Sequence, residues 1–449
     1  MAHLHNISTV SMGDFLMTDK GKKKNLLIYA HYYSPDPAST GQILQELAEG
    51  MRDSFNITVI CVVPSYNGTV APEYQTQRFF CENLDAIKVI RLRVPGFNKK
   101  NKVSRVKNIL AYFVGAMKAT TIVGKQDYVF SISQPPILGG LLGVYGKWKK
   151  HAKFIYNIQD FNPEQIMAVK YEESRFINGL MMWFDKLSCR KSNLVITVGR
   201  DLADTLESRF KNVNVPKCMV INNWINEKQI YPLEDKNEKI VAFKKKYGIE
   251  DKFVIMYSGN LGLYYDLEGL IRVMKRFRKG HTIDGIYEEG WKSADGKEVV
   301  FVFVGEGAVQ DRLKDYSVRH HFENIVFIPY QDKEQLIYSL NAADVHWCIN
   351  AKGIKGVSCP SKAYGIMAVA KPIIGVLEEG SEIHCLIDEI GCGKCCEPGD
   401  YANIEGVLRW FIMNSNEIRE MGVLGRKYLE ENLTKDMSIG KYIRAIKML

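Results

Sequence analysis

Residues 357–376 read Val-Ser-Cys-Pro-Ser-Lys-Ala-Tyr-Gly-Ile-Met-Ala-Val-Ala-Lys-Pro-Ile-Ile-Gly-Val. This order predicts a polar loop, a short helix with Lys362 in its first turn, a Lys-Pro corner and a buried strand. The unpaired N–H groups at a helix start favour a phosphate, and a lysine there opposes the helix dipole unless an anion is bound. The residues alone are equally consistent with an ordinary surface lysine beside a core helix.

The length and composition indicate a globular protein with two or three domains. The chain has 449 residues, of which 46% are hydrophobic and 25% are charged. No run approaches the roughly 18 consecutive apolar residues of a membrane-spanning helix. The first 24 residues are polar and end in a basic run, without the order of a signal peptide. We therefore expect a disordered N-terminal extension over residues 1–24 and a cytoplasmic protein.

The ten cysteines lie mostly inside apolar segments, where a free thiol behaves as a small hydrophobic group. The run Cys392-Gly-Lys-Cys395-Cys396 is similar to half of a zinc site. A second pair of ligands at metal spacing is missing from the sequence, so we predict a short strand at this run and no metal site.

Short apolar runs alternate with helical stretches, and the alternation restarts near residue 253. Such alternation predicts parallel sheets covered by helices, and its repetition predicts two doubly wound Rossmann-like α/β domains that face a central cleft. We expect these domains over residues 25–220 and 221–433, a final helix over 434–449 and an exposed insertion over 278–297. The strands are expected at 26–30, 57–63, 87–91, 128–132, 154–158 and 194–198, and then at 253–257, 299–304, 325–328, 345–349 and 373–376.

The net charge of +9 is concentrated in one segment, because no carboxylate occurs between Asp85 and Asp127. Residues 103–118 combine this charge with apolar residues at helical spacing. A basic amphipathic helix suits an anionic membrane surface, although a core helix with a solvated basic face is the alternative. The basic stretch has no aromatic-interleaved stripe or other nucleic-acid motif. The residues expected to face the membrane are Lys99, Lys100, Lys102, Arg105 and Lys107.

Polar residues follow the expected strands of the first domain, at the edge where doubly wound folds bind ligands. A proline-stiffened loop after the first strand ends in Ser39-Thr40-Gly41, which could approach a phosphate or an acceptor, or form a plain turn. Ser133 begins a Ser-Gln-Pro-Pro run. Asp160 and Glu164 are candidates for acid–base chemistry or for holding sugar hydroxyls, and Glu164 alternatively is a charge at a helix start.

Glycines follow the strands of the second domain. The segment Gly259-Asn-Leu-Gly262 lets the backbone come close to a ligand, and Asn260 offers both a donor and an acceptor. Gly305-Glu306-Gly307 ends the next strand. Residues 327–330, Phe-Ile-Pro-Tyr, could form an apolar wall for a flat heterocycle.

These segments together resemble the family 4 glycosyltransferases, in the branch of the WbuB-like fucosamine transferases. The resemblance rests on the Pro-Ser-Lys block at 360–362, the Asp-Phe-Asn-Pro-Glu run at 160–164, the Ser-Gln-Pro-Pro run and the two glycine loops. The resemblance implies catalytic roles for Asp160 and Lys362. It implies donor contacts at Gly41, Gly259, Asn260, Gly262, Gly305, Glu306, Gly307, Ile328, Tyr330, Ser361 and Lys362, and an acceptor cleft with Ser39, Thr40, Ser133 and Glu164.

The resemblance also implies a GT-B fold whose final helix crosses back to the first domain. It implies metal-independent transfer, with retention of configuration, from a nucleotide diphosphate-sugar that we expect to be UDP-linked. The expected acceptor is a glycan on polyprenyl diphosphate, in bacterial surface polysaccharide assembly at the inner membrane surface. No cofactor and no nucleic acid partner are expected.

The sequence departs from the family at two carboxylates. Many relatives hold the donor with a pair of glutamates at positions that are Val357 and Gly365 here, and the usual glycine before the Lys-Pro corner is Ala370. These losses keep open a non-catalytic partner of a glycosyltransferase complex. A sugar-nucleotide 2-epimerase of the same architecture is a further alternative, although its carboxylate and histidine pattern is missing.

Overall fold

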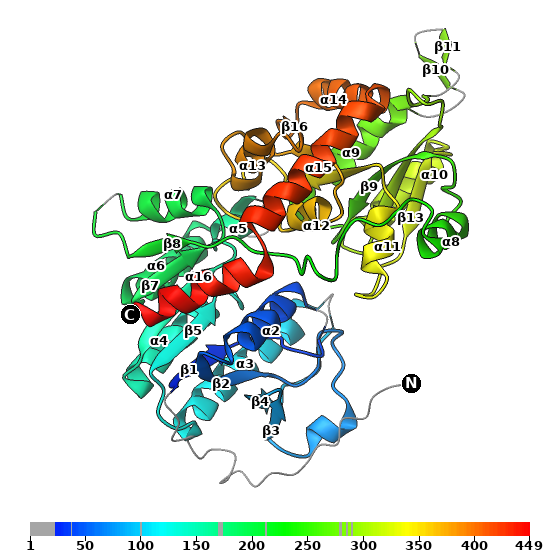
Figure 1. Cartoon of the computed structure of the whole chain (residues 1–449). Coiled ribbons are helices and arrows are strands. Elements are labelled where there is room, and N and C mark those ends of the chain that lie inside the picture. Colours follow the sequence, from blue (N-terminus) through cyan, green and yellow to red (C-terminus); the bar gives the residue numbers. More distant parts are fainter. Residues whose placement is uncertain are drawn as a thin grey trace.

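The computed structural model describes residues 23–36, 38–98, 101–168, 174–211, 213–277, 281–283, 286–288 and 291–449. Two α/β domains lie side by side, and the C-terminal helix returns to the first of them (Figure 1). The expected N-terminal extension lies almost wholly outside the described residues. The same is true of Lys99 and Lys100.

The first domain is built on an eight-stranded sheet with the order β3-β4-β2-β1-β5-β6-β7-β8. All neighbouring strands are parallel except β3, which pairs antiparallel with β4 at one edge. The sequence analysis did not predict β3, because its residues are only partly buried and do not form a continuous apolar run. The strands are β1 Lys24–Tyr29, β2 Phe55–Val62, β3 Phe79–Leu84, β4 Ile87–Leu92, β5 Tyr128–Ile132, β6 Lys153–Ile158, β7 Leu194–Thr197 and β8 Cys218–Val220.

Helices cover both faces of this sheet, as its apolar strands require. One core includes Tyr112 of α3 and Leu142 of α4, and the opposite core includes Leu47 of α2 and Tyr442 of α16. The helices of this domain are α2 Ser39–Met51, α3 Lys102–Ile122, α4 Leu138–Lys150, α5 Glu164–Ala168, α6 Arg175–Lys191 and α7 Arg200–Arg209, with a 3-10 turn η1 at Pro72–Gln75.

The second domain has a six-stranded parallel sheet with the order β13-β12-β9-β14-β15-β16. Its strands are β9 Phe253–Ser258, β12 Val299–Val304, β13 Ile325–Ile328, β14 Val345–Ile349, β15 Ile373–Val376 and β16 Gly393–Cys396. The expected insertion holds a hairpin of β10 His281–Ile283 and β11 Ile286–Glu288. The Cys392–Cys396 run forms β16, as predicted.

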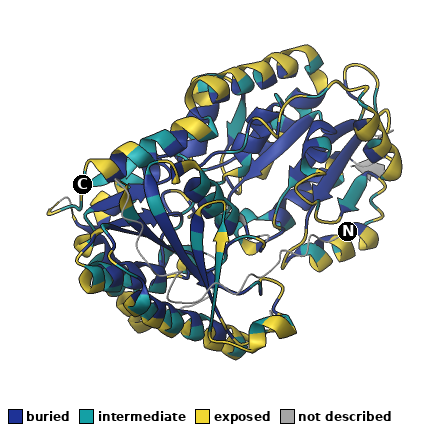
Figure 2. Cartoon of the chain, turned by 60° about the horizontal axis from the view of Figure 1, so that its bottom comes forward, coloured by how far each residue is buried: buried dark blue, intermediate teal, exposed yellow. Residues whose placement is uncertain are grey.

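The helices of the second domain also lie on both faces of its sheet, and Figure 2 shows the buried strands beneath exposed helix surfaces. Its helices are α8 Glu238–Lys246, α9 Leu267–Met274, α10 Gln310–Arg319, α11 Leu336–Asn341, α12 Lys362–Ala368, α13 Glu382–Ile390, α14 Tyr401–Met413 and α15 Ser415–Asn432, with 3-10 turns η2 Leu263–Tyr265 and η3 Lys275–Phe277.

The last helix, α16 Lys435–Lys447, packs against α2 of the first domain. Ile439, Tyr442 and Ile446 are buried in that domain's core, and the Asn157 amide of β6 donates to the Tyr442 hydroxyl at 3.1 Å. A Cβ atom on Gly50 would lie 2.6 Å from Ile439 Cδ1, so the two helices approach closely only because residue 50 is glycine.

The architecture confirms the predicted fold class of two facing doubly wound domains. The amphipathic helix at 103–118 lies within α3, but its buried face is formed by Asn108, Tyr112 and Ala116, while Val106 and Leu110 are exposed. The apolar residues of this helix are therefore divided, since Phe113 and Met117 pack against the core while Val103, Val106 and Leu110 are exposed. None of the described helices has the length and hydropathy that spanning a bilayer requires.

Candidate functional site

Lys362 begins α12 at the carboxyl edge of the second sheet, and two tyrosines surround its half-buried ammonium group. Its Nζ donates to the Tyr257 hydroxyl at 2.7 Å and lies 3.9 Å from the centroid of that ring and 4.2 Å from the centroid of the Tyr265 ring. Both rings present π electrons to the cation. No carboxylate in the described part of the chain forms an ion pair with Lys362.

Burial lowers the pKa of Lys362 from 10.5 to about 8. The cause is desolvation, since a charged amine loses water contacts without gaining a carboxylate. The site therefore carries a cation whose charge is incompletely compensated. An anion such as a diphosphate would stabilise the ammonium form and raise its pKa again.

Two glycine loops lie beside this lysine. A Cβ atom on Gly259 would lie 3.6 Å from Lys362 Nζ, and one on Gly305 would lie 2.1 Å from the Gly259 carbonyl oxygen. Both residues have positive φ angles, of 144° and 132°, which favour glycine. The Gly307 Cα likewise packs against the carbonyl of Leu261. The loops after β9 and β12 thus pack together next to Lys362.

The other residues expected to contact the donor differ in how far they are exposed to solvent. Asn260, Glu306 and Ser361 are exposed, and Gly262 is buried. The Ile328 side chain is fully buried, and its carbonyl accepts from the Gly305 N–H at 2.9 Å, so its contact with a base stays a prediction. Tyr330 is 58% exposed. Burial raises the pKa of Tyr66 of the first domain, and the nearby Tyr330 raises it further.

Asp160 follows β6 in the first domain and is the centre of a hydrogen-bonded network. The Ser133 hydroxyl accepts from the backbone N–H groups of Gln159 and Asp160, at 3.1 and 3.2 Å. The Asp160 carboxylate accepts from the side chains of Gln134 and Ser358, and Thr40 donates to Gln134 at 3.0 Å. Burial raises the pKa of Asp160, although these hydrogen bonds act in the opposite direction.

The structure joins this network directly to the second domain. Asp160 and Ser358 form an antiparallel β-bridge, and the Phe161 N–H donates to the Val357 carbonyl at 2.8 Å. Val357 itself packs in the core of the first domain. Val357 is therefore an interdomain contact. The Asp160 segment and the 357–376 block, predicted separately, lie at one junction.

A second junction lies at Glu382, which the sequence analysis did not identify. Its buried carboxylate accepts from the Arg200 backbone N–H at 2.7 Å, from Arg200 Nε at 2.9 Å and from the Asn222 side chain at 2.9 Å. The neighbouring Asp201 carboxylate accepts from the Gly356 N–H at 2.9 Å. Charged groups of the two domains thus fix each other beside the cleft.

Glu164, Ser39 and Gly41 are the remaining residues of the first domain that were expected to contact the acceptor or the donor. Both oxygens of Glu164 contact Arg209, which also pairs with the buried Asp185. Glu164 therefore has a structural partner in the first domain, and its contact with an acceptor stays a prediction. Ser39 and Gly41 lie in the first turn of α2, and a Cβ atom on Gly41 would lie 3.0 Å from the Tyr32 carbonyl oxygen.

His31 is a further candidate that the sequence analysis missed. It follows β1, is buried, and its ring centroid lies 4.2 Å from that of Tyr32 and 4.8 Å from that of Tyr112. Burial lowers its pKa to about 4, so the imidazole is neutral near pH 7. Its Nε2 has no hydrogen-bond partner among the described residues. A lone histidine after a strand carries no distinctive sequence signal.

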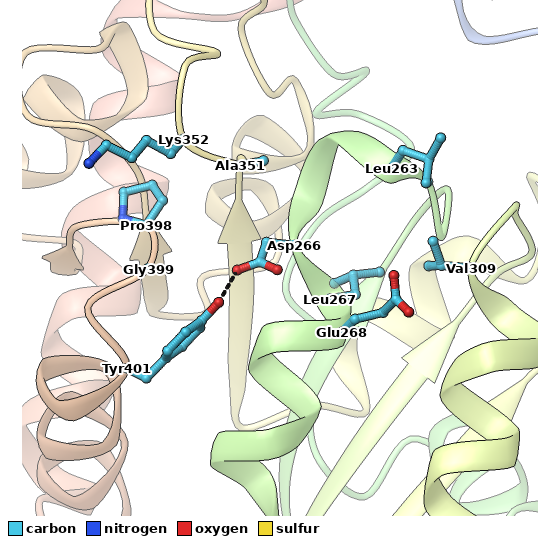
Figure 3. Close-up of a pocket in the computed structure, with 11 residues that line it drawn as sticks. Leu263, Asp266, Leu267, Glu268, Val309, Ala351, Lys352, Pro398, Gly399 and Tyr401 are labelled. Atoms are coloured by element: carbon cyan, nitrogen blue, oxygen red, sulfur yellow. Dashed lines mark hydrogen bonds between the residues drawn. The ribbon is translucent and has the colours of Figure 1, made fainter. Parts of the chain in front are cut away.

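A cavity of about 350 Å³ opens at the carboxyl edge of the second sheet (Figure 3). Turn η2 contributes Leu263 to this cavity and Tyr265 to the surroundings of Lys362. Its carboxylates already have partners, since the Tyr401 hydroxyl donates to Asp266 at 2.6 Å and Arg312 pairs with Glu268 at 3.2 Å. The lining residues are Gly262, Leu263, Asp266, Leu267, Glu268, Val309, Ala351, Lys352, Pro398, Gly399 and Tyr401.

One group of potential metal ligands occurs among the described residues. Ligand atoms of His384, Asp388 and Cys395 lie within 4.8 Å of one another, and Asp388 is exposed. Structural zinc sites use four protein ligands, so this group is an incomplete set. It includes Cys395 of the run that the sequence analysis considered, but not Cys392 or Cys396.

Comparison with known proteins agrees with this architecture. Residues 239–428 match the family model described as "Glycosyl transferases group 1". The chain is 23% identical over 431 residues to "Probable glycosyltransferase WbjE" of Pseudomonas aeruginosa, covering 94% of this chain and 98% of that protein. It is 21% identical over 438 residues to WcaI of Escherichia coli, named as a colanic acid biosynthesis glycosyl transferase, covering 94% and 99%.

Two solved structures have the same fold over nearly the whole chain. Sucrose-phosphate synthase from Thermosynechococcus elongatus is 14% identical with a TM-score of 0.71, covering 95% of this chain and 100% of that one. Anabaena HepE in complex with UDP-glucose is 12% identical with a TM-score of 0.64, at the same coverage. The chain therefore has the GT-B fold, is similar over its length to bacterial glycosyltransferases, and carries a second domain that matches group 1 of these enzymes.

Proposed function

We propose that this protein is a retaining glycosyltransferase of family 4, in the WbuB-like branch. Its donor would be a UDP-linked hexose or N-acetylhexosamine, and its acceptor a glycan on polyprenyl diphosphate in bacterial surface polysaccharide assembly. The observation that carries the proposal is Lys362, a half-buried cation without a carboxylate partner beside two glycine loops. The named activities of WbjE and WcaI and the UDP-glucose complex of HepE support the same class.

The proposed chemistry follows from where charge develops. When the bond to the sugar breaks, negative charge grows on the leaving diphosphate, and a fixed cation stabilises that state more than the bound substrate. Lys362 would supply this charge, so we propose that transfer needs no metal. The leaving diphosphate would assist removal of the acceptor proton, and Asp160 would hold the acceptor hydroxyl from the opposite domain.

A second reading is a non-catalytic GT-B partner of a glycosyltransferase complex. It is favoured by Val357 and Gly365, which stand where relatives have glutamates and are both buried here. Turnover with a lipid-linked acceptor distinguishes the two readings. A catalytic protein releases UDP with that acceptor, whereas a partner protein binds without turnover.

The first experiment is nucleotide binding by calorimetry and thermal shift. A ligand that binds only the folded state stabilises it by RT ln(1 + [L]/Kd), about 2.7 kcal/mol at a hundredfold excess over Kd. We expect stabilisation by UDP and not by GDP. Equal stabilisation by both nucleotides would contradict the UDP assignment, and no stabilisation by either would contradict the donor site.

We also propose that the protein associates peripherally with the anionic inner membrane surface through α3. Lys102, Arg105 and Lys107 are all exposed on this helix, next to its exposed apolar stripe. Basic residues beside apolar ones favour binding to anionic lipid.

A further inference from the structure

One face of the first domain is formed by three helices, with α4 packed between α3 and α6. These helices contain a single carboxylate, Asp185. That side chain is buried, where it accepts from the Tyr156 hydroxyl at 2.7 Å and pairs with Arg209 at 2.5 Å. The solvent side of all three helices therefore carries basic, polar and apolar groups without any acid.

All three helices expose large apolar side chains to water, since α4 exposes Trp148 at 68% and α3 and α6 each expose several. On α6, Phe176 is 80% exposed and Trp183 is 57% exposed, and on α3, Leu110 is 50% exposed. Contiguous exposed apolar groups of this size mark an interaction surface in a soluble fold. The exposed apolar residues of the two helices are Val103, Val106, Leu110 and Val114 on α3, and Phe176, Ile177, Leu180 and Trp183 on α6.

Both apolar stripes begin at the same end of the domain as the cleft. Helices α3 and α6 follow β4 and β6 along the chain, so their first turns lie near the carboxyl edge of the sheet. The charge of Arg105 acts on Tyr32, which follows β1 at that edge. The exposed cations in these first turns are Lys102, Arg105, Lys107 and Arg175.

We propose that α3 and α6 together form a docking surface for an anionic lipid bilayer, with Phe176 and Trp183 as the inserting anchors. This inference extends the proposed membrane contact from one basic helix to a surface of two helices. Only the biological reason for docking, access to a lipid-linked acceptor, rests on the proposed function. Docking in this way holds the mouth of the cleft, beside Asp160, at the lipid headgroups. A lipid-linked acceptor then reaches the site without leaving the bilayer.

The chemistry favours a bilayer over other occupants. A second copy of the same face would bring cations against cations, because helices α3, α4 and α6 offer no exposed carboxylate for complementarity. Single-stranded nucleic acid binds through aromatic rings along a basic groove, whereas most of the exposed apolar residues here are aliphatic. Aromatic side chains beside basic ones are typical of helices that lie in the membrane interface.

The test is sedimentation of the full-length protein with vesicles of phosphatidylcholine that contain or lack phosphatidylglycerol. We expect binding to the anionic vesicles that weakens with salt, and little binding to pure phosphatidylcholine. The Phe176→Glu/Trp183→Glu double variant should bind at least roughly tenfold more weakly, because each side chain loses apolar insertion and gains repulsion. Val318→Glu is the matched control, since Val318 is 74% exposed on α10 of the second domain, and it should bind like the wild type.

Equal binding of the double variant and the wild type would overturn the proposal, as would binding to duplex or single-stranded nucleic acid as tight as that to the vesicles. UDP titration of the same variants keeps the two proposals separate. Lost vesicle binding with intact UDP binding supports the docking surface. A wild type that binds vesicles but no nucleotide would contradict the donor site alone.

Discussion

Asp160 of the first domain and Lys362 of the second lie near the same interdomain junction, yet their surroundings are opposite. Asp160 is held by side chains of both domains and by a β-bridge to Ser358. Among the described residues, Lys362 contacts the rings of Tyr257 and Tyr265 and forms no ion pair, and burial lowers its pKa to about 8. The protein itself supplies hydrogen-bond partners for the Asp160 carboxylate, whereas the Lys362 ammonium group would gain its counter-ion from a bound anion.

The difference indicates which part of the site depends on a ligand. A charge surrounded by hydrogen bonds keeps its position whether or not a substrate is bound. A buried charge without a counter-ion raises the free energy of the empty site, and a bound anion relieves that cost. Donor binding should therefore be sensitive to Lys362, and acceptor chemistry to the geometry around Asp160.

Lys362→Ala should have the largest effect, because it removes the only side-chain cation that we place on the diphosphate. We expect transfer to fall by roughly a hundred- to a thousandfold, with a nearly unchanged melting temperature. Steady-state rates and thermal unfolding measure both. Lys245→Ala, an exposed lysine of α8, is the control and should retain full activity. Wild-type activity of Lys362→Ala would contradict the role.

Asp160→Asn should separate the two sides of the cleft. Asparagine preserves the size of the side chain and most of its hydrogen bonds but removes the charge, so turnover should fall roughly a hundredfold while UDP affinity stays within about twofold. Calorimetry and rate measurements on the same preparation provide the comparison. A parallel loss of UDP affinity would show that the acid acts on the donor instead.

The pH dependence of UDP binding should sharpen the contrast. With a pKa of about 8, Lys362 loses its proton as the pH rises from 7 to 9, so UDP affinity should fall about tenfold over this range. The Lys362→Arg variant stays charged, and the ratio of the two affinities removes the ligand's own titration. A constant ratio would show that the titrating group lies elsewhere.

The same shift affects the stability of the empty protein. The unfolded chain keeps its lysine protonated up to about 10.5, whereas the folded chain releases the proton above about 8. The unfolded state therefore binds more protons between these values, and the contribution of Lys362 to the free energy of unfolding should rise with pH there. Saturating UDP should abolish this rise, and denaturant titrations from pH 7.5 to 10 can follow it.

Thr40→Val should have the smallest effect. It removes one hydrogen bond to Gln134, at the outer end of the Asp160 network, and leaves the direct contacts of the carboxylate in place. A loss of about 1 kcal/mol in this bond corresponds to a severalfold fall in turnover. Gln134→Leu, one contact closer, should cost more, and the reverse order would contradict the proposed chain of contacts.

Much of the fold could be predicted from the sequence, because its strands are long buried runs such as 299–304 and 57–63. The helix at Lys362 and the strand after the Lys-Pro corner were also predicted. The edge strand β3 was not, since it is half-exposed and alternates weakly. The exposure of Val103, Val106 and Leu110 on α3 could not be predicted, because helical periodicity shows that one face is apolar but not which part of it meets a core.

The site could be predicted only in pieces. The residues after each strand were identifiable, since parallel strands bring their carboxyl ends to one edge. The β-bridge between Asp160 and Ser358, the Glu382 contacts and the cavity near Asp266 depend on how loops far apart in the chain meet. Such contacts leave no local pattern in the sequence.

The return of α16 to the first domain has a consequence for the order of folding during synthesis. The first sheet is complete by Val220, but α16, which covers part of its apolar face, is synthesised only after the whole second domain. Until then Leu47 and Ile57 lack part of their cover, and the nascent first domain exposes apolar surface to chaperones. Loss of the last 15 or so residues should therefore impair the solubility of the first domain more than that of the second, although the missing segment follows the second in the chain.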